Sequence, residues 1–90
     1  MTGTYVAYNQ ITCRSTTIEI PEDGLLRYTE TGDGYYFDYY FDYGLEGNEI
    51  YIYDPGLAIY YDMLTIEPDG NLSYTDYAEE GAFTVWFVKQ

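Results

Sequence analysis

The chain has 90 residues, the size of one domain, and 47% of them are hydrophobic, which is enough for a single core. Sixteen acidic residues stand against three basic ones, so the formal net charge is −13. A surface of this sign repels nucleic acid and anionic membranes and attracts basic partners. The absence of His excludes a histidine general base and the catalytic triads that need one.

Short clusters of Gly, Pro, Asp and Asn recur along the chain between runs of Tyr, Ile, Thr, Phe and Val. This pattern is typical of antiparallel strands joined by hairpins. It predicts strands over 4–13, 16–20, 25–31, 35–43, 49–53, 58–66, 71–77 and 83–89. We therefore expect a single all-β domain over residues 1–90, an antiparallel meander of about seven strands that forms a small barrel or a sandwich.

One segment allows a second interpretation. Asp54, Pro55 and the apolar residues that follow them match the start of a helix, and a short helix over 55–64 is the alternative to a strand there. The run of Ile59, Tyr60 and Tyr61 favours the strand.

The segment 35–43 alternates in a way that separates two faces of a strand. One face is aromatic throughout and consists of Tyr35, Phe37, Tyr39, Phe41 and Tyr43. The other face mixes rings with acids and consists of Tyr36, Asp38, Tyr40 and Asp42. Because unpaired buried carboxylates are costly, only the first face is expected to line the core.

The next strand, 49–53, alternates too, and a hairpin must bring the two apolar faces together. A four-residue loop over 45–48 satisfies this condition. It places Tyr43 opposite Ile50 and Phe41 opposite Ile52, and on the solvent side Asp42 opposite Tyr51 and Tyr40 opposite Tyr53. The predicted partner-binding face then consists of Tyr36, Asp38, Tyr40, Asp42, Glu46, Glu49, Tyr51 and Tyr53.

Spacing and charge suggest what this face binds. Same-face residues of a strand repeat at about 6.6–6.8 Å, close to two phosphate steps of about 3.4 Å along one DNA strand. The chain resembles, in charge and size, the small acidic nucleic-acid mimics with which phages block host restriction, repair or CRISPR enzymes. We therefore expect an inhibitor that occupies the basic nucleic-acid-binding surface of a partner protein, with Tyr rings adding contact area.

A ligand-binding barrel is the alternative function. The segments 46–53 and 61–66 and the closing strand 83–89 resemble, in their strand spacing, the second half of small bacterial lipocalin-like domains. That resemblance implies a meandering barrel that holds an apolar ligand.

Other functions lack their residues. No Cys/His set for zinc, glycine-rich phosphate loop or calcium-binding loop is present, so we expect no metal, no cofactor and no enzymatic activity. Cys13 is the single cysteine and is expected to be a buried or half-buried thiol. No signal peptide or membrane-length apolar run is recognised, so the prediction is a cytoplasmic protein that binds neither membrane nor nucleic acid directly.

Overall fold

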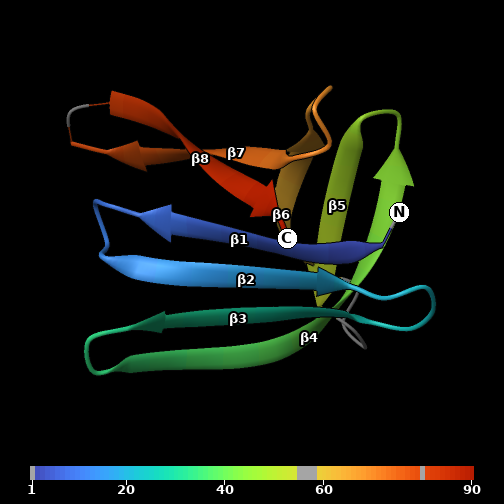
Figure 1. The fold of residues 1–90 in the computed structure, drawn as a ribbon, viewed down its shortest axis with the longest axis horizontal. Coiled ribbons are helices and arrows are strands. Elements are labelled where there is room, and N and C mark those ends of the chain that lie inside the picture. The colour runs from blue at the N-terminus through green and yellow to red at the C-terminus, as the bar shows by residue number, and fades with distance from the viewer. Residues whose placement is uncertain (1, 55–58, 80) are drawn as a thin grey trace.

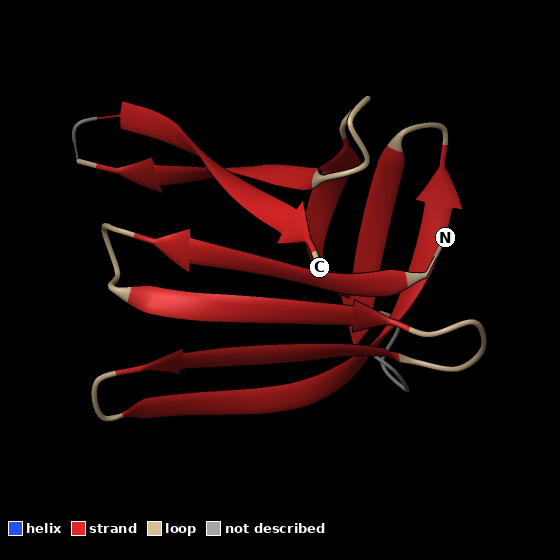
Figure 2. Ribbon diagram, in the orientation of Figure 1, coloured by secondary structure: helices blue, strands red, loops and turns tan. Residues whose placement is uncertain are grey.

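The computed structural model describes the backbone of residues 2–54, 59–79 and 81–90, and their side chains except those of 59–61, 77 and 78. This part of the chain contains eight strands, each antiparallel to the next, and β8 returns to β1 to close a barrel (Figures 1 and 2). The strands are β1 (Gly3–Asn9), β2 (Arg14–Ile20), β3 (Leu26–Gly32), β4 (Tyr35–Glu46), β5 (Glu49–Asp54), β6 (Ile59–Ile66), β7 (Leu72–Ala78) and β8 (Gly81–Lys89).

The predicted all-β meander is confirmed, as a closed barrel with eight strands instead of about seven. The helix alternative over 55–64 is wrong for residues 59–64, which belong to β6, while residues 55–58 lie outside the described part of the chain. β-branched and aromatic side chains fit the pleated surface of a strand better than a helix, and this preference prevails in β6.

The core follows from the alternation of each strand. Inward-facing apolar residues such as Ile18, Leu26 and Ile50 have no exposed surface. Burial of one such side chain stabilises the fold by about 1.5–3 kcal/mol. The core consists of Tyr5, Ala7, Ile18, Ile20, Leu26, Tyr28, Phe41, Ile50, Ile52, Leu64, Leu72, Val85 and Phe87.

β4 belongs to both halves of the barrel. Its first part, to Phe41, pairs with β3, and its second part, from Asp42 to Glu46, pairs with β5. In Figure 1 the strand curves away from β1–β3 as it makes this change, and β5 runs beside its second part. Residues at the two ends of β4 therefore lie on different parts of the outer surface.

The β7–β8 hairpin is attached to its neighbours over a short length. Among the described residues, β7 pairs with β6 only through Thr65–Ser73 and Ile66–Leu72, and β8 pairs with β1 only through two residue pairs, one of which is Val6–Val88. The N–H of Gln90 donates a further hydrogen bond of 2.8 Å to the carbonyl of Thr4. Beyond these contacts, the hairpin separates from β1 in Figure 1.

The first strand is shorter than the predicted 4–13. The side-chain oxygen of Asn9 accepts hydrogen bonds from the N–H groups of Ile11 (2.9 Å) and Thr12 (3.2 Å), so the chain turns at this point. Such local side-chain bonds compete with the strand ladder. Cys13 follows in the left-handed region, with a φ of 57°, and is exposed, so the expectation of a buried or half-buried thiol is wrong.

Candidate functional site

The β4–β5 hairpin has a different register from the predicted one. Tyr43 lies opposite Ile52 rather than Ile50, and Asp42 lies opposite Tyr53 rather than Tyr51. The loop has two residues, 47 and 48, because Glu46 still pairs with Glu49. Gly47 has a φ of 61°, the left-handed value that a tight hairpin turn of the type II′ kind needs at its first central position.

This shift moves each pair by two residues, so the alternation of the two faces is unchanged. Tyr39, which was expected to line the core, is 41% exposed. Ile50 and Ile52 are fully buried and Phe41 is 2% exposed, as expected of an inner face. The predictions that Phe41 opposes Ile52 and that Tyr40 opposes Tyr53 are wrong, because Ile52 pairs with Tyr43 and Tyr53 with Asp42. Phe41 and Tyr40 lie in the part of β4 that pairs with β3. The eight predicted site residues therefore form two groups instead of one continuous patch.

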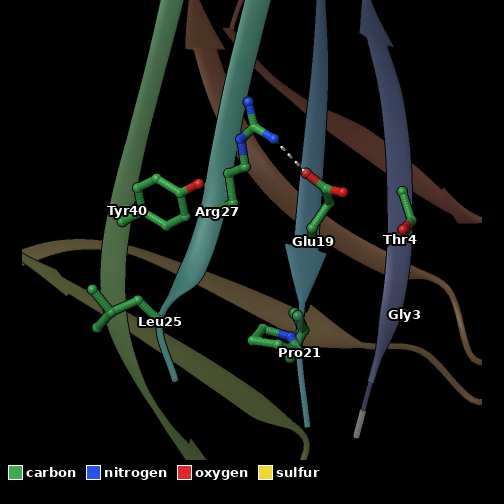
Figure 3. A pocket seen from close by; sticks show the side chains of 8 residues that line it. Gly3, Thr4, Glu19, Pro21, Leu25, Arg27 and Tyr40 are labelled. Carbon is green, nitrogen blue, oxygen red and sulfur yellow. Dashed lines mark ion pairs between the residues drawn. The ribbon is translucent and has the colours of Figure 1, made fainter. Parts of the chain in front are cut away.

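The first group surrounds Arg27. The guanidinium group donates two hydrogen bonds to Asp38, from Nε at 3.0 Å and from Nη2 at 2.7 Å, and Nη1 lies 3.7 Å from Glu19. The hydroxyl of Tyr36 donates to the same carboxylate at 3.3 Å, and Arg27 lies 6.0 Å from the ring centre of Tyr40. Figure 3 shows Arg27 between Tyr40 and Glu19.

These contacts change the electrostatics of the predicted face. The hydrogen bonds from Arg27 hold the pKa of Asp38 below its usual range, and Asp38 in turn raises the pKa of Arg27. The charge of Asp38 is thus already matched within the protein. What this group still offers to a partner is ring surface, because Tyr36 is 69% exposed and Tyr40 is 51% exposed.

The second group, which we call the outer acidic strip, consists of Asp42, Glu46, Glu49, Tyr51 and Tyr53 on β4 and β5. None of its carboxylates forms an ion pair with any of the three bases, all of which belong to the described part of the chain. Opposite Tyr51 stands Gly44, which carries no side chain, and a Cβ built there would meet no atom within 4 Å. Space is therefore open on the outer face of β4 at Gly44, opposite Tyr51.

Glu46 and Glu49 lie directly opposite each other across the hairpin. Like charges in this arrangement destabilise a sheet. The hydroxyl of Tyr51 donates a hydrogen bond of 3.2 Å to Glu49. Partial burial, then this hydrogen bond and the charges of Glu49 and Glu46, raise the pKa of Tyr51.

A third set of acids faces the barrel interior and was not predicted. We call Glu30, Asp62 and Asp76 the inner carboxylates; all three line one cavity. Asp76 accepts hydrogen bonds of 3.2 Å from Asn9 and from the hydroxyl of Tyr74.

The strand pattern contained a signal for the inner carboxylates. Each lies two residues from a core position on its own strand: Glu30 from Tyr28, Asp62 from Leu64, and Asp76 from Tyr74, which packs against the core. Such residues share a face. Because acids were expected to point to solvent, this spacing was not used to place the inner carboxylates inside the barrel.

Two further observations concern metal binding and membrane crossing. Among the described residues, no three His, Cys, Asp or Glu side chains lie close enough to hold a metal ion. No helix in that part of the chain is long and apolar enough to cross a membrane.

Comparisons with protein-family models, with curated proteins and with solved structures found no match.

Proposed function

We propose that this chain is a binding protein whose outer acidic strip occupies the basic nucleic-acid-binding surface of a partner protein. The observation that carries the proposal is the cluster of three carboxylates on one hairpin, Asp42, Glu46 and Glu49, none of which pairs with a base of the chain itself. The net charge of −13 supports it, because a charge of about −2 to −8 is sufficient for the solubility of a small domain.

The opposed pair at the hairpin end strengthens the argument. Glu46 and Glu49 repel each other in the free protein. A basic partner would remove this repulsion on binding, so part of the cost of holding the two charges together would be recovered as affinity. Arg and Lys side chains of a nucleic-acid groove supply suitable charges.

The tyrosines supply contact area beside the charges. Tyr51 and Tyr53 flank the carboxylates of the strip, and Tyr36 and Tyr40 expose their rings on the first part of β4. Such rings stack on guanidinium groups and bury apolar surface, which slows dissociation. Carboxylates on the same strip accelerate association, and this contribution weakens as salt increases.

The lipocalin-like alternative has less support. A cavity does lie inside the barrel, but three carboxylates line it, and this chemistry does not suit an apolar ligand. We therefore do not propose an apolar-ligand carrier.

The test uses two triple variants that remove the same charge from different places. Asp42→Asn, Glu46→Gln and Glu49→Gln neutralise the strip. Asp23→Asn, Asp33→Asn and Glu79→Gln neutralise three exposed turn residues and form the matched control.

Immobilised protein is incubated with a nuclease-treated lysate, and each captured protein is then purified and its affinity measured with and without excess duplex DNA or RNA. We expect DNA or RNA to displace the chain, and the strip variant to bind at least tenfold more weakly, about 1.4 kcal/mol, at low salt. The control variant should stay within about threefold of the parent (about 0.65 kcal/mol). Equal losses in the two variants, or captured proteins that excess DNA and RNA do not displace, contradict the proposal.

A further inference from the structure

A cavity of about 380 Å³ lies inside the barrel, at the end that holds the β1–β2, β3–β4 and β7–β8 turns. Its walls come from β1, β2, β3, β6, β7 and β8. The volume falls in the range of about 300–1,000 Å³ that is usual for small-molecule sites. The mouths of β-barrels are among the places where such sites occur.

The cavity exists because two strand ladders end early. The pairing of β6 with β7 stops at Thr65–Ser73, so Asp62 on β6 lies beyond the ladder and is not tied to β7 by strand pairing. The pairing of β8 with β1 stops at Val6–Val88. The β7–β8 hairpin thus forms one wall of the cavity that is paired with its neighbours near a single end.

The inner carboxylates give this cavity its charge. Glu30 is partly neutralised by Arg14, whose Nη1 lies 3.8 Å away, and Asp76 accepts hydrogen bonds from Asn9 and Tyr74. Asp62 differs from both. Among the described residues, its hydrogen-bond donor is the backbone N–H of Met63 at 2.8 Å, and no Lys or Arg forms an ion pair with it.

The charges of all three inner carboxylates affect the pKa of one hydroxyl, that of Tyr74. Burial raises the pKa of Tyr74, and the charge and hydrogen bond of Asp76 and the charges of Asp62 and Glu30 raise it further. Burial likewise raises the pKa of Asp62, assisted by the charge of Asp76 and opposed by the N–H of Met63. A positive charge inside the cavity would relieve this accumulation of negative charge.

The remaining wall chemistry selects among cations. Tyr28 and Tyr74 bring aromatic rings to the cavity, and Val85 adds an apolar surface. Rings and carboxylates together suit an alkylammonium group, which has both a charge and an apolar body. A bare metal ion fits less well, because the described carboxylates are not grouped closely enough to coordinate one.

We propose that the barrel cavity binds a small aliphatic amine, with an ammonium group held by Asp62 and Asp76 and its carbon chain packed against Tyr28 and Tyr74. This site is separate from the outer acidic strip, which belongs to β4 and β5, two strands that contribute no residue to the cavity wall. The two proposals therefore stand or fall independently.

The test is calorimetric titration with 1,4-diaminobutane at low ionic strength, with 1,4-butanediol as the uncharged ligand of the same length. We expect the diamine to bind with a stoichiometry of one and the diol not to bind. Asp62→Asn keeps the shape of the side chain and its acceptor for Met63, and should weaken diamine binding at least tenfold. Asp33→Asn, an exposed acid in the turn at the same barrel end, should change it less than twofold.

A second measurement does not depend on any variant folding correctly. In the parent protein, diamine-dependent NMR shifts should be confined to residues around the cavity, among them Tyr74, Asp76 and Val85. The proposal is overturned if no diamine binds, if the diol binds equally well, if Asp33→Asn and Asp62→Asn lose affinity to the same extent, or if the shifts spread over the outer surface.

Discussion

The β1–β4 sheet and the β7–β8 hairpin use strand pairing in different ways. Within β1–β4, adjacent strands are joined by six or seven residue pairs. The hairpin has seven pairs within itself but only two on each side to the rest of the barrel. Stability is therefore expected to concentrate in the first region, and the cavity with its inner carboxylates opens beside the second. Regions that bind ligands are commonly drawn from the less stable part of a fold.

A matched pair of truncations tests this difference most strongly. Phe41 is 2% exposed and packs in the core of the four-stranded sheet, whereas Phe83 is partly buried on the hairpin. Phe41→Ala should lower the free energy of unfolding by about 3–5 kcal/mol and Phe83→Ala by about 1 kcal/mol. Urea denaturation measures both. Similar losses would show that the hairpin is as well packed as the sheet.

Hydrogen exchange compares the two regions without any mutation. Amides of the central ladder, such as those of Thr17 and Tyr28, should exchange only when the whole barrel unfolds. Amides near the hairpin tip, such as Thr75 and Thr84, should exchange at least tenfold faster, because opening the tip breaks no pairing with β1 or β6. Uniform protection factors in both regions would contradict the comparison.

Asp62 provides a smaller and opposite effect. Its pKa is raised in the folded state, so its ionisation opposes folding: the contribution of Asp62 is most favourable at low pH and is lost as pH rises from about 4 through the folded-state pKa. Asp62→Asn should therefore stabilise the protein at pH 7, by about 0.5 kcal/mol because solvent screens a partly exposed group. Thermal unfolding at pH 7 and below pH 4 measures the gain, which should disappear at the lower pH. A destabilised variant at pH 7 would contradict this role.

The smallest expected effect concerns Arg27 and Asp38, which are exposed on the four-stranded sheet. The pKa of Asp38 is lowered in the folded state, so the pair stabilises the fold above the ordinary pKa of about 4 and this contribution is lost as pH falls through the folded-state value. Arg27→Gln should lower the melting temperature slightly at pH 7, and less in 1 M salt. A double-mutant cycle with Asp38→Asn isolates the pair, and a coupling that does not change with salt would contradict the assignment.

Alternation and turn residues were sufficient to predict the architecture, but not the register of β4 and β5. A loop over 45–48 and a turn of residues 47 and 48 both keep Phe41 inside and Asp42 outside, so the pattern of apolar residues cannot distinguish them. Gly47 distinguishes the two registers, because its left-handed φ suits a two-residue turn. The predicted four-residue loop did not take this property of glycine into account.

The outer and inner sites differed in how far the sequence revealed them. The face of each predicted outer residue followed from alternation along β4 and β5. The ion pair of Asp38 with Arg27 did not, because it joins neighbouring strands whose register depends on the Asp33–Gly34 turn. The inner carboxylates come from three strands, and only the closed barrel brings them to one cavity.

The short ladder between β1 and β8 has a consequence for how the chain folds. It joins Tyr5 to Lys89, residues close to the two ends of the sequence, so it has the largest loop-closure cost of any pairing in the barrel. We expect it to form last. Until then the chain is an open sheet with two free edge strands, the species most exposed to aggregation. Mutual repulsion between chains of charge −13 would protect that intermediate, which gives the acidic composition a kinetic role during folding.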